Sequence, residues 1–216
     1  MKYNTVIFDF DGVIVDSWLG IAKGFVKALG AYGITETIEN VKKMIGPPFA
    51  KLIIEKYGFD KEEGKKAIMI HRKYVQEHGC FEATLYDGVY EMLQTLDNMG
   101  VQMAIASNKP IENVKLQIKY FEIEKFFKEV IAQDTMQTRG EKSDLVREVM
   151  NNLNIKNPRK VLMVGDKPTD ILGGKTNKTD TVMADYGYGS EEEKATCNAN
   201  YHIKTPLELI NIVKGE

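Results

Sequence analysis

The chain has 216 residues, of which 43% are hydrophobic and 28% charged, and its formal net charge is −2 at pH 7. This composition is typical of a folded globular protein, and the lack of a basic tract argues against a nucleic-acid-binding surface. Two cysteines, Cys80 and Cys197, make neither a disulfide framework nor a paired zinc motif, and they fit a reducing compartment. No apolar stretch approaches the roughly 18 residues of a membrane span, and the first residues do not resemble a signal peptide. We therefore expect a cytoplasmic protein that binds neither nucleic acid nor membrane.

The first expected element is a buried strand that ends in two acidic residues. The run from Val6 to Phe10 is β-prone and apolar, as in a central parallel strand covered on both faces. Asp9 and Asp11 interrupt this pattern, because two neighbouring carboxylates repel each other and are costly to bury unpaired. A shared cation such as Mg²⁺ would remove that cost, and Gly12 would allow a sharp turn with a close backbone approach to a ligand.

Residues 17 to about 80 have helical periodicity and contain no strand-like run. We expect helices over 17–29 and 35–45, one that starts at Pro47-Pro48, and one that a capping box of Asp60 and Glu63 opens. A crossover between parallel strands needs only one helix. Four helices in a row therefore predict an inserted helical domain.

From residue 86 onward, strands and helices alternate. Helices are expected at 87–99, 111–120, 142–154, from about 169, and at 206–213; strands are expected at 101–106, 129–132, 160–164, 181–184 and 201–203. This alternation predicts an α/β fold with a doubly wound, Rossmann-like parallel sheet. In such sheets the functional site lies beyond the carboxyl ends of the strands.

Polar residues follow three of these strands. Ser107 and Asn108 come after the strand at 101–106, where a helix N-terminus would favour phosphate binding, although serine also serves as an ordinary helix cap. Lys142 opens a helix, an electrostatically unfavourable position for a cation, although most lysines are simply solvated. Asp166 ends an apolar strand and Asp170 follows one helical turn later, so both can face the same site.

Together, in this order, these residues resemble the motifs of the haloacid dehalogenase superfamily of phosphotransferases, and the resemblance covers essentially the whole chain. The stretch Asp9-Phe10-Asp11-Gly12 is similar to the first motif, Ser107 to the second, Lys142 to the third, and Asp166 with Asp170 to the fourth. The resemblance implies an α/β core formed by residues 1–16 and 81–216 and a small helical cap formed by residues 17–80.

Shorter strings at 45–48, 107–110 and 188–190 are similar to the phosphoglycolate phosphatase branch. Two departures, a polar segment at 173–180 and the absence of a Lys-Pro-x-Pro string at Lys142, leave pyrophosphatases and nucleotidases open. Lys42, Lys43 and Lys51 flank the Gly46-Pro47-Pro48 turn and are candidates to bind a substrate anion, although a solvated basic face is the simpler interpretation of each.

The resemblance implies a Mg²⁺-dependent phosphatase that hydrolyses a small phosphorylated metabolite through an aspartyl-phosphate. Asp9 would be the nucleophile and Asp11 the general acid and base. The metal would be held by Asp9, Asp166 and the main-chain carbonyl of Asp11. Phosphate would be bound by Ser107, Lys142 and the N–H groups of Gly12 and Asn108, and Asp170 would orient Lys142 or a metal-bound water.

Several alternatives share these residues. A phosphomutase of the β-phosphoglucomutase type or an inorganic pyrophosphatase would use the same pair of acids, and a receiver-like signalling module would also accept phosphate on an aspartate. A catalytically silent binding protein is a further alternative. A dehalogenase would need no acid/base residue at position 11, so Asp11 favours phosphoryl chemistry. We expect a monomer or a homodimer, and the sequence does not name the substrate.

Overall fold

The computed structural model describes residues 1–42, 44, 49–134 and 138–216. The chain falls into two compact units: Met1–Asp16 with Leu85–Glu216, and Ser17–Thr84. None of the helices in the described part of the chain is long and apolar enough to cross a membrane.

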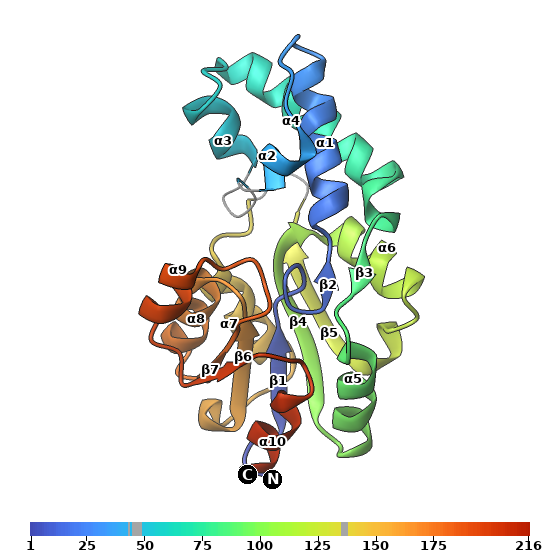
Figure 1. Ribbon diagram of the computed structural model, residues 1–216. Coiled ribbons are helices and arrows are strands. Elements are labelled where there is room, and N and C mark those ends of the chain that lie inside the picture. Colours follow the sequence, from blue (N-terminus) through green and yellow to red (C-terminus); the bar gives the residue numbers. More distant parts are fainter. Residues whose placement is uncertain (43, 45–48, 135–137) are drawn as a thin grey trace. The chain divides into compact units, whose positions relative to one another are not determined.

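The first unit is built on a six-stranded parallel sheet with the strand order β5-β4-β1-β6-β7-β8 (Figure 1). Its strands are β1 (Thr5–Phe8), β4 (Gln102–Pro110), β5 (Phe127–Gln133), β6 (Val161–Gly165), β7 (Asp180–Ala184) and β8 (Tyr201–Ile203). All four residues of β1 are buried, as expected for a central strand that is covered on both faces. The predicted doubly wound α/β fold is confirmed.

Helices follow most of these strands. They are α5 (Val89–Asn98), α6 (Ile111–Tyr120), α7 (Lys142–Asn152), α8 (Pro168–Thr176), α9 (Glu191–Thr196) and α10 (Glu208–Lys214), with 3₁₀ turns at Glu124–Phe126 and Pro158–Lys160. In α7, Leu145, Val146 and Val149 lie at helical spacing and pack against Ile7 and Met163 of the sheet. This packing fixes the first residue of α7 beside the carboxyl edge of the sheet.

The second unit is helical. It contains α1 (Trp18–Gly30), α2 (Ile38–Lys42), α3 (Phe49–Glu55), α4 (Lys61–Glu77) and a 3₁₀ turn at Gly79–Phe81. The capping box predicted at the start of α4 is present: Asp60 accepts hydrogen bonds from the main chain of Glu62 and Glu63, and the Glu63 side chain accepts one from the Asp60 N–H. Two short strands, β2 (Val15–Asp16) and β3 (Thr84–Leu85), form a separate two-stranded sheet where the chain passes between the units.

The structure corrects several element boundaries. The strand predicted to end at Ala106 continues to Pro110, with a shift in pairing register between Ser107 and Pro110. The helix predicted over 35–45 is described only over Ile38–Lys42, and the predicted start at Pro47-Pro48 lies outside the described residues. Short elements with little periodicity, β2, β3 and α9, were not predicted.

Candidate active site

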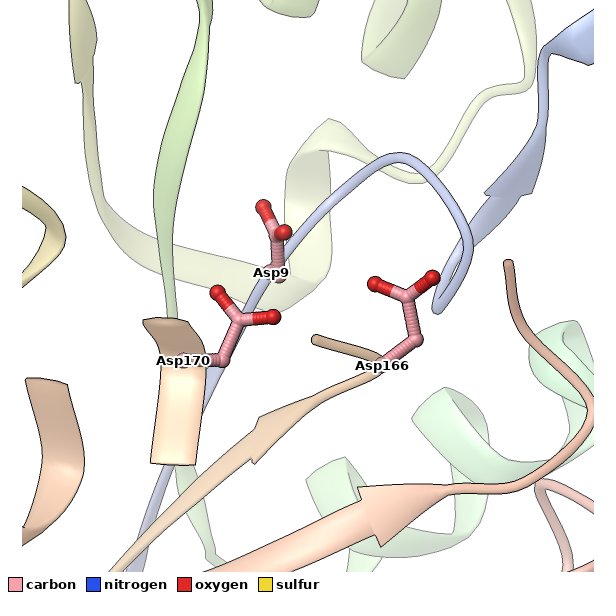
Figure 2. Close-up of side chains that lie close together, drawn as sticks. All are labelled: Asp9, Asp166 and Asp170. Carbon is pink, nitrogen blue, oxygen red and sulfur yellow. The ribbon is translucent and has the colours of Figure 1, made fainter. Parts of the chain in front are cut away.

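Three neighbouring strands bring the candidate residues to one edge of the sheet. Phe8, the last residue of β1, pairs with Ile105 of β4 on one side and with Val164 of β6 on the other. The residues that follow, Asp9 after β1 and Asp166 after β6, therefore emerge side by side, and the Asp9 N–H donates to the carbonyl of Val164 at 2.8 Å. Figure 2 shows Asp9, Asp166 and Asp170 rising from three separate segments.

Lys142 lies at the centre of the site. Its Nζ is 2.9 Å from Oδ1 of Asp9, 2.9 Å from Oδ1 of Asp170 and 2.9 Å from the main-chain oxygen of Ala106. Its side chain is only 2% exposed. Burial alone would lower the pKa of Lys142, but attraction to Asp170 and Asp9 outweighs this effect and raises the pKa above its ordinary value. The buried ammonium is therefore charged and held by two carboxylates.

Asp170 serves both the site and the fold. Its Oδ1 contacts Lys142, and its Oδ2 accepts a hydrogen bond from the Lys167 N–H at 3.0 Å at the start of α8. The same acid thus contacts the site lysine and stabilises the start of α8. The polar segment that follows does not distort the helix, because α8 continues to Thr176.

Three acidic side chains, those of Asp9, Asp166 and Asp170, lie around the single ammonium of Lys142. One carboxylate oxygen from each of Asp9, Asp166 and Asp170 lies within 4.8 Å of the others. Burial raises the pKa of Asp9, a shift that Lys142 opposes and Asp170 reinforces. Burial, followed by repulsion from Asp170 and Asp9, raises the pKa of Asp166 well above its usual range. Three desolvated carboxylates with one ammonium retain excess negative charge, and their oxygens are the ligand type that a hard divalent cation prefers. The residues present fit such a cation.

The turn after Asp9 is close to this cluster. Gly12 has a φ of +84°, and a Cβ placed on it would lie 2.2 Å from Oδ2 of Asp166. Only glycine meets both conditions without strain. The Gly12 N–H donates to the carbonyl of Val15 at 2.9 Å, so the structure uses within the turn a donor that we had expected to bind phosphate.

Asp11 lies apart from the acidic cluster and has its own cation. Its Oδ1 is 2.7 Å from Nζ of Lys109, whose side chain is 5% exposed. The Lys109 ammonium also lies 5.3 Å from the centre of the Phe10 ring. Sequence reasoning missed this lysine, because it placed residues 107–110 between the predicted strand and the predicted helix and gave Lys109 no role.

The surroundings of Ser107 differ from those predicted. Ser107 is buried within β4, which continues to Pro110, and α6 begins at Ile111, where the helix was predicted to begin. The serine does not cap that helix; its Oγ accepts a hydrogen bond from the Lys109 N–H at 3.3 Å. Asn108 is exposed on the same strand. The strand therefore continues through these polar residues up to the predicted helix, and phosphate binding by Ser107 and Asn108 stays a prediction.

The candidate anion-binding lysines lie in the helical unit. The Lys42 ammonium is 3.9 Å from the centre of the Trp18 ring, a cation–π contact within that unit. Lys43, the turn at residues 45–48 and the side chain of Lys51 lie outside the described residues.

The main chain of Tyr188 also contacts the acidic cluster. Its N–H donates to Oδ2 of Asp166 at 2.7 Å. We had noted Tyr188 only as part of a short family-like string. Its two neighbouring glycines were a signal that the backbone there approaches something closely.

Comparison with known proteins agrees with this geometry. The family model of haloacid dehalogenase-like hydrolases matches residues 6–184. A 5'-nucleotidase from Pseudomonas aeruginosa is 29% identical over 89% of this chain and 87% of that protein. Pyrophosphatase PpaX from Halalkalibacterium halodurans is 29% identical over 99% of this chain and 98% of that protein. Tyrosine-protein kinase PtkA from Mycobacterium tuberculosis is 30% identical over 94% of this chain and 70% of that protein. The names of these three relatives refer to different substrates.

Solved structures share the whole fold. The crystal structure of a predicted phosphatase from Clostridium acetobutylicum has a TM-score of 0.91 at 31% identity and covers 100% of both chains. A predicted phosphoglycolate phosphatase from Haemophilus somnus has a TM-score of 0.85 at 21% identity, covering 98% of both chains, and this likeness concerns the fold alone. The acidic cluster, the buried lysine and the family match lead to one conclusion: the chain belongs to the haloacid dehalogenase-like hydrolases.

Proposed function

We propose that this enzyme is a Mg²⁺-dependent phosphatase that hydrolyses a small-molecule phosphate monoester through an aspartyl-phosphate on Asp9. The observation that carries the proposal is the contact of one buried ammonium, that of Lys142, with both Asp9 and Asp170 at the carboxyl edge of the sheet. A solvated acid at a strand end would not need a buried cation beside it. A carboxylate nucleophile that must approach an anionic phosphate does need such a cation.

In this proposal Asp9 attacks phosphorus and the leaving oxygen departs with a proton from Asp11. Asp11 then accepts a proton from the water that hydrolyses the aspartyl-phosphate. Lys109, at 2.7 Å from Asp11, holds this carboxylate in place. Lys142 offsets the charge of the transferring phosphoryl group, the contribution that dominates in this chemistry. Ser107 and the N–H of Asn108 bind the phosphate oxygens.

Asp9, Asp166 and the main-chain carbonyl of Asp11 would hold the Mg²⁺ ion. The ion would supply positive charge that allows two anions, the nucleophile and the phosphate, to approach each other. Burial, reinforced by repulsion from Asp170, raises the pKa values of Asp9 and Asp166, and a bound cation would offset both effects.

The substrate class rests on chemistry and on relatives. Phosphoglycolate, a sugar phosphate or a nucleotide would suit a site of this kind, and the nucleotidase and pyrophosphatase relatives make nucleoside monophosphates and pyrophosphate equally direct candidates. A phosphomutase would use the same Asp9 and Asp11 but return the phosphoryl group to a sugar.

The test compares wild-type protein with Asp9→Asn in phosphate release from an aryl phosphate, with MgCl₂ and with excess chelator. We expect Asp9→Asn to lower the rate at least about 1,000-fold and the chelator to abolish wild-type activity. Asp97→Asn is the matched control, since Asp97 is exposed near the end of α5, on the side where β4 begins, away from the carboxyl edge. Full activity in Asp9→Asn would refute the covalent mechanism.

The same assay then separates the alternatives. Phosphate release across phosphoglycolate, pyrophosphate, nucleoside monophosphates and sugar phosphates identifies the preferred substrate. Interconversion of hexose phosphate isomers without net phosphate release would indicate a mutase. A long-lived phosphoprotein without turnover would indicate a receiver-like module.

A further inference from the structure

The loop between β7 and α9, residues 185–190, lies directly against Asp166. A Cβ on Gly187 would lie 2.3 Å from Cβ of Asp166 and 2.4 Å from the main-chain oxygen of Gly12. A Cβ on Gly189 would lie 2.4 Å from the main-chain oxygen of Asp166. The loop backbone therefore touches Asp166 on both sides of Tyr188, and the Tyr188 N–H donates to Oδ2 of the same aspartate at 2.7 Å.

The tyrosine side chains of this loop are anchored to other segments of the same unit. The Tyr188 hydroxyl donates to Oδ1 of Asp16 at 2.9 Å. The Tyr186 hydroxyl donates to the carbonyl of Val13 at 3.0 Å, and its ring lies 5.0 Å from that of Tyr86. Tyr86 is also hydrogen-bonded to Tyr188.

These anchors sit at both passages of the chain between its units. Asp16 is the last residue of the first unit before the helical segment, and Tyr86 comes just after the chain returns at Leu85. The Tyr86 N–H donates to the carbonyl of Ile14 at 3.3 Å, so the outgoing and returning segments are also joined to each other. A continuous set of hydrogen bonds thus runs from the two connecting segments to Asp166.

We propose that Tyr188 is a positioning residue of the metal site: its hydroxyl, held by Asp16, keeps its main-chain N–H on Oδ2 of Asp166. This inference rests on the proposed function, in which Asp166 is a metal ligand. With Oδ2 fixed by the N–H, the carboxylate has one orientation and presents Oδ1 to the site. Groups that orient a ligand in this way contribute substantially to metal affinity, because the ligand is then already in place before the ion binds.

The hydrogen bond to Asp16 restrains the side chain of Tyr188, whereas a second contact restrains its main chain. Lys167 Nζ also donates to the carbonyl of Tyr188 at 3.1 Å. Because this second contact to the main chain of Tyr188 remains, loss of the hydroxyl is expected to loosen the loop without unfolding it.

The experiment measures MgCl₂ binding to the full chain by titration calorimetry, in wild type and in Tyr188→Phe, which removes the hydroxyl and keeps the N–H. We expect the variant to bind Mg²⁺ about 10-fold more weakly, with an unchanged thermal midpoint. Tyr90→Phe is the matched control, because it removes a tyrosine hydroxyl that accepts a hydrogen bond from Lys125 in the same unit.

A second variant, Asp16→Ala, removes the same hydrogen bond from its other end and keeps the test valid if Tyr188→Phe does not fold. We expect Asp16→Ala to weaken Mg²⁺ binding to a similar degree, and the double variant to show no further loss. Mg²⁺ affinity within two-fold of wild type in Tyr188→Phe, or an equal loss in Tyr90→Phe, would overturn the inference.

Failure of the proposed function gives a different result. If wild-type protein itself binds no Mg²⁺, the metal assignment fails and the positioning role falls with it. If wild-type protein binds Mg²⁺ and the Tyr188→Phe variant binds it equally well, only the positioning role is refuted.

Discussion

Replacement of Lys142 by methionine tests the charge balance of the site most directly. Methionine keeps most of the side-chain volume but removes the ammonium that contacts Asp9, Asp170 and the Ala106 carbonyl, each at 2.9 Å. Asp170 is 1% exposed and Asp9 is 14% exposed. Removal of one partner from a buried ion pair costs about 3–5 kcal/mol, because the remaining charge stays buried without compensation.

We therefore expect Lys142→Met to lower the free energy of unfolding by about 3–5 kcal/mol in the presence of chelator. Urea denaturation followed by far-ultraviolet circular dichroism measures this difference. Lys115→Met is the control, since Lys115 is exposed on α6 and its replacement is expected to change stability by less than about 0.5 kcal/mol. In the phosphatase assay, Lys142→Met is expected to lower kcat by about 100-fold to 1,000-fold.

The pH dependence of the Lys142→Met effect identifies its cause. Lys142 lowers the pKa of Asp9, which burial already raises, so the variant raises this pKa further. Folded protein then binds more protons than unfolded protein at mildly acidic pH, and the stability of the variant relative to wild type rises as the pH falls. The double variant Lys142→Met/Asp170→Asn should recover much of the lost stability. An unchanged unfolding free energy in Lys142→Met, or a loss independent of pH, would refute this reasoning.

Two further predictions concern the turn after Asp9 and the helical unit. Gly12→Ala is expected to weaken Mg²⁺ binding at least about 10-fold, because the new Cβ would meet Asp166. Gly100→Ala is the control: Gly100 has a φ of +73° and open space around it, so its replacement should lower only the free energy of unfolding, by about 1–2 kcal/mol. Burial, with a smaller contribution from Arg72, lowers the pKa of His71 from 6.5 to about 4. The unfolded state therefore binds more protons than the folded state between these values, so stability is expected to fall by up to about 3 kcal/mol from pH 7 to pH 4. Trp18 fluorescence, the only tryptophan signal of the chain, measures the loss in the helical unit. A His71→Leu variant with the same pH dependence as wild type would contradict it.

The acidic residues at the centre of the site could be predicted from the sequence because each occupies a locally unfavourable position. Asp9 and Asp166 follow apolar strands, where an acid is costly to bury, and both lie at the same edge because the sheet is parallel. The strand pairing Phe8–Val164 then brings them together.

The environment of Ser107 could not be predicted in the same way. The stretch 107–110 is polar and ends in proline, so local rules favour a connection that leads into the helix at 111–120. Lys109 is nevertheless buried, and what makes its burial possible is Asp11, 98 residues away in the sequence. A single sequence does not show such a pairing, and therefore it does not show that the strand continues.

The loop at residues 185–190 illustrates the same limit. Locally, alternating tyrosines and glycines indicate a turn, and nothing in the string itself points to Asp166. The contact arises because β7 lies next to β6 in the sheet, which places the end of β7 beside the residue that follows β6. The function of the loop is thus a property of strand order, and Tyr188 acquires its proposed role only through that order.

Lys142 shows why a local penalty is useful evidence for a site. A cation at the first position of a helix faces the positive end of the helix dipole, which costs up to about 1 kcal/mol in exposed positions. The structure shows that burial adds a second penalty and that two carboxylates outweigh both, since the pKa of Lys142 is raised rather than lowered. The helix dipole and burial both disfavour a charged lysine at this position, and the surrounding acids compensate for both. The chemistry of those acids therefore explains Lys142 better than the stability of the helix does. The same does not hold for Asp170, because Asp170 also caps α8 and would be retained there without any catalytic role.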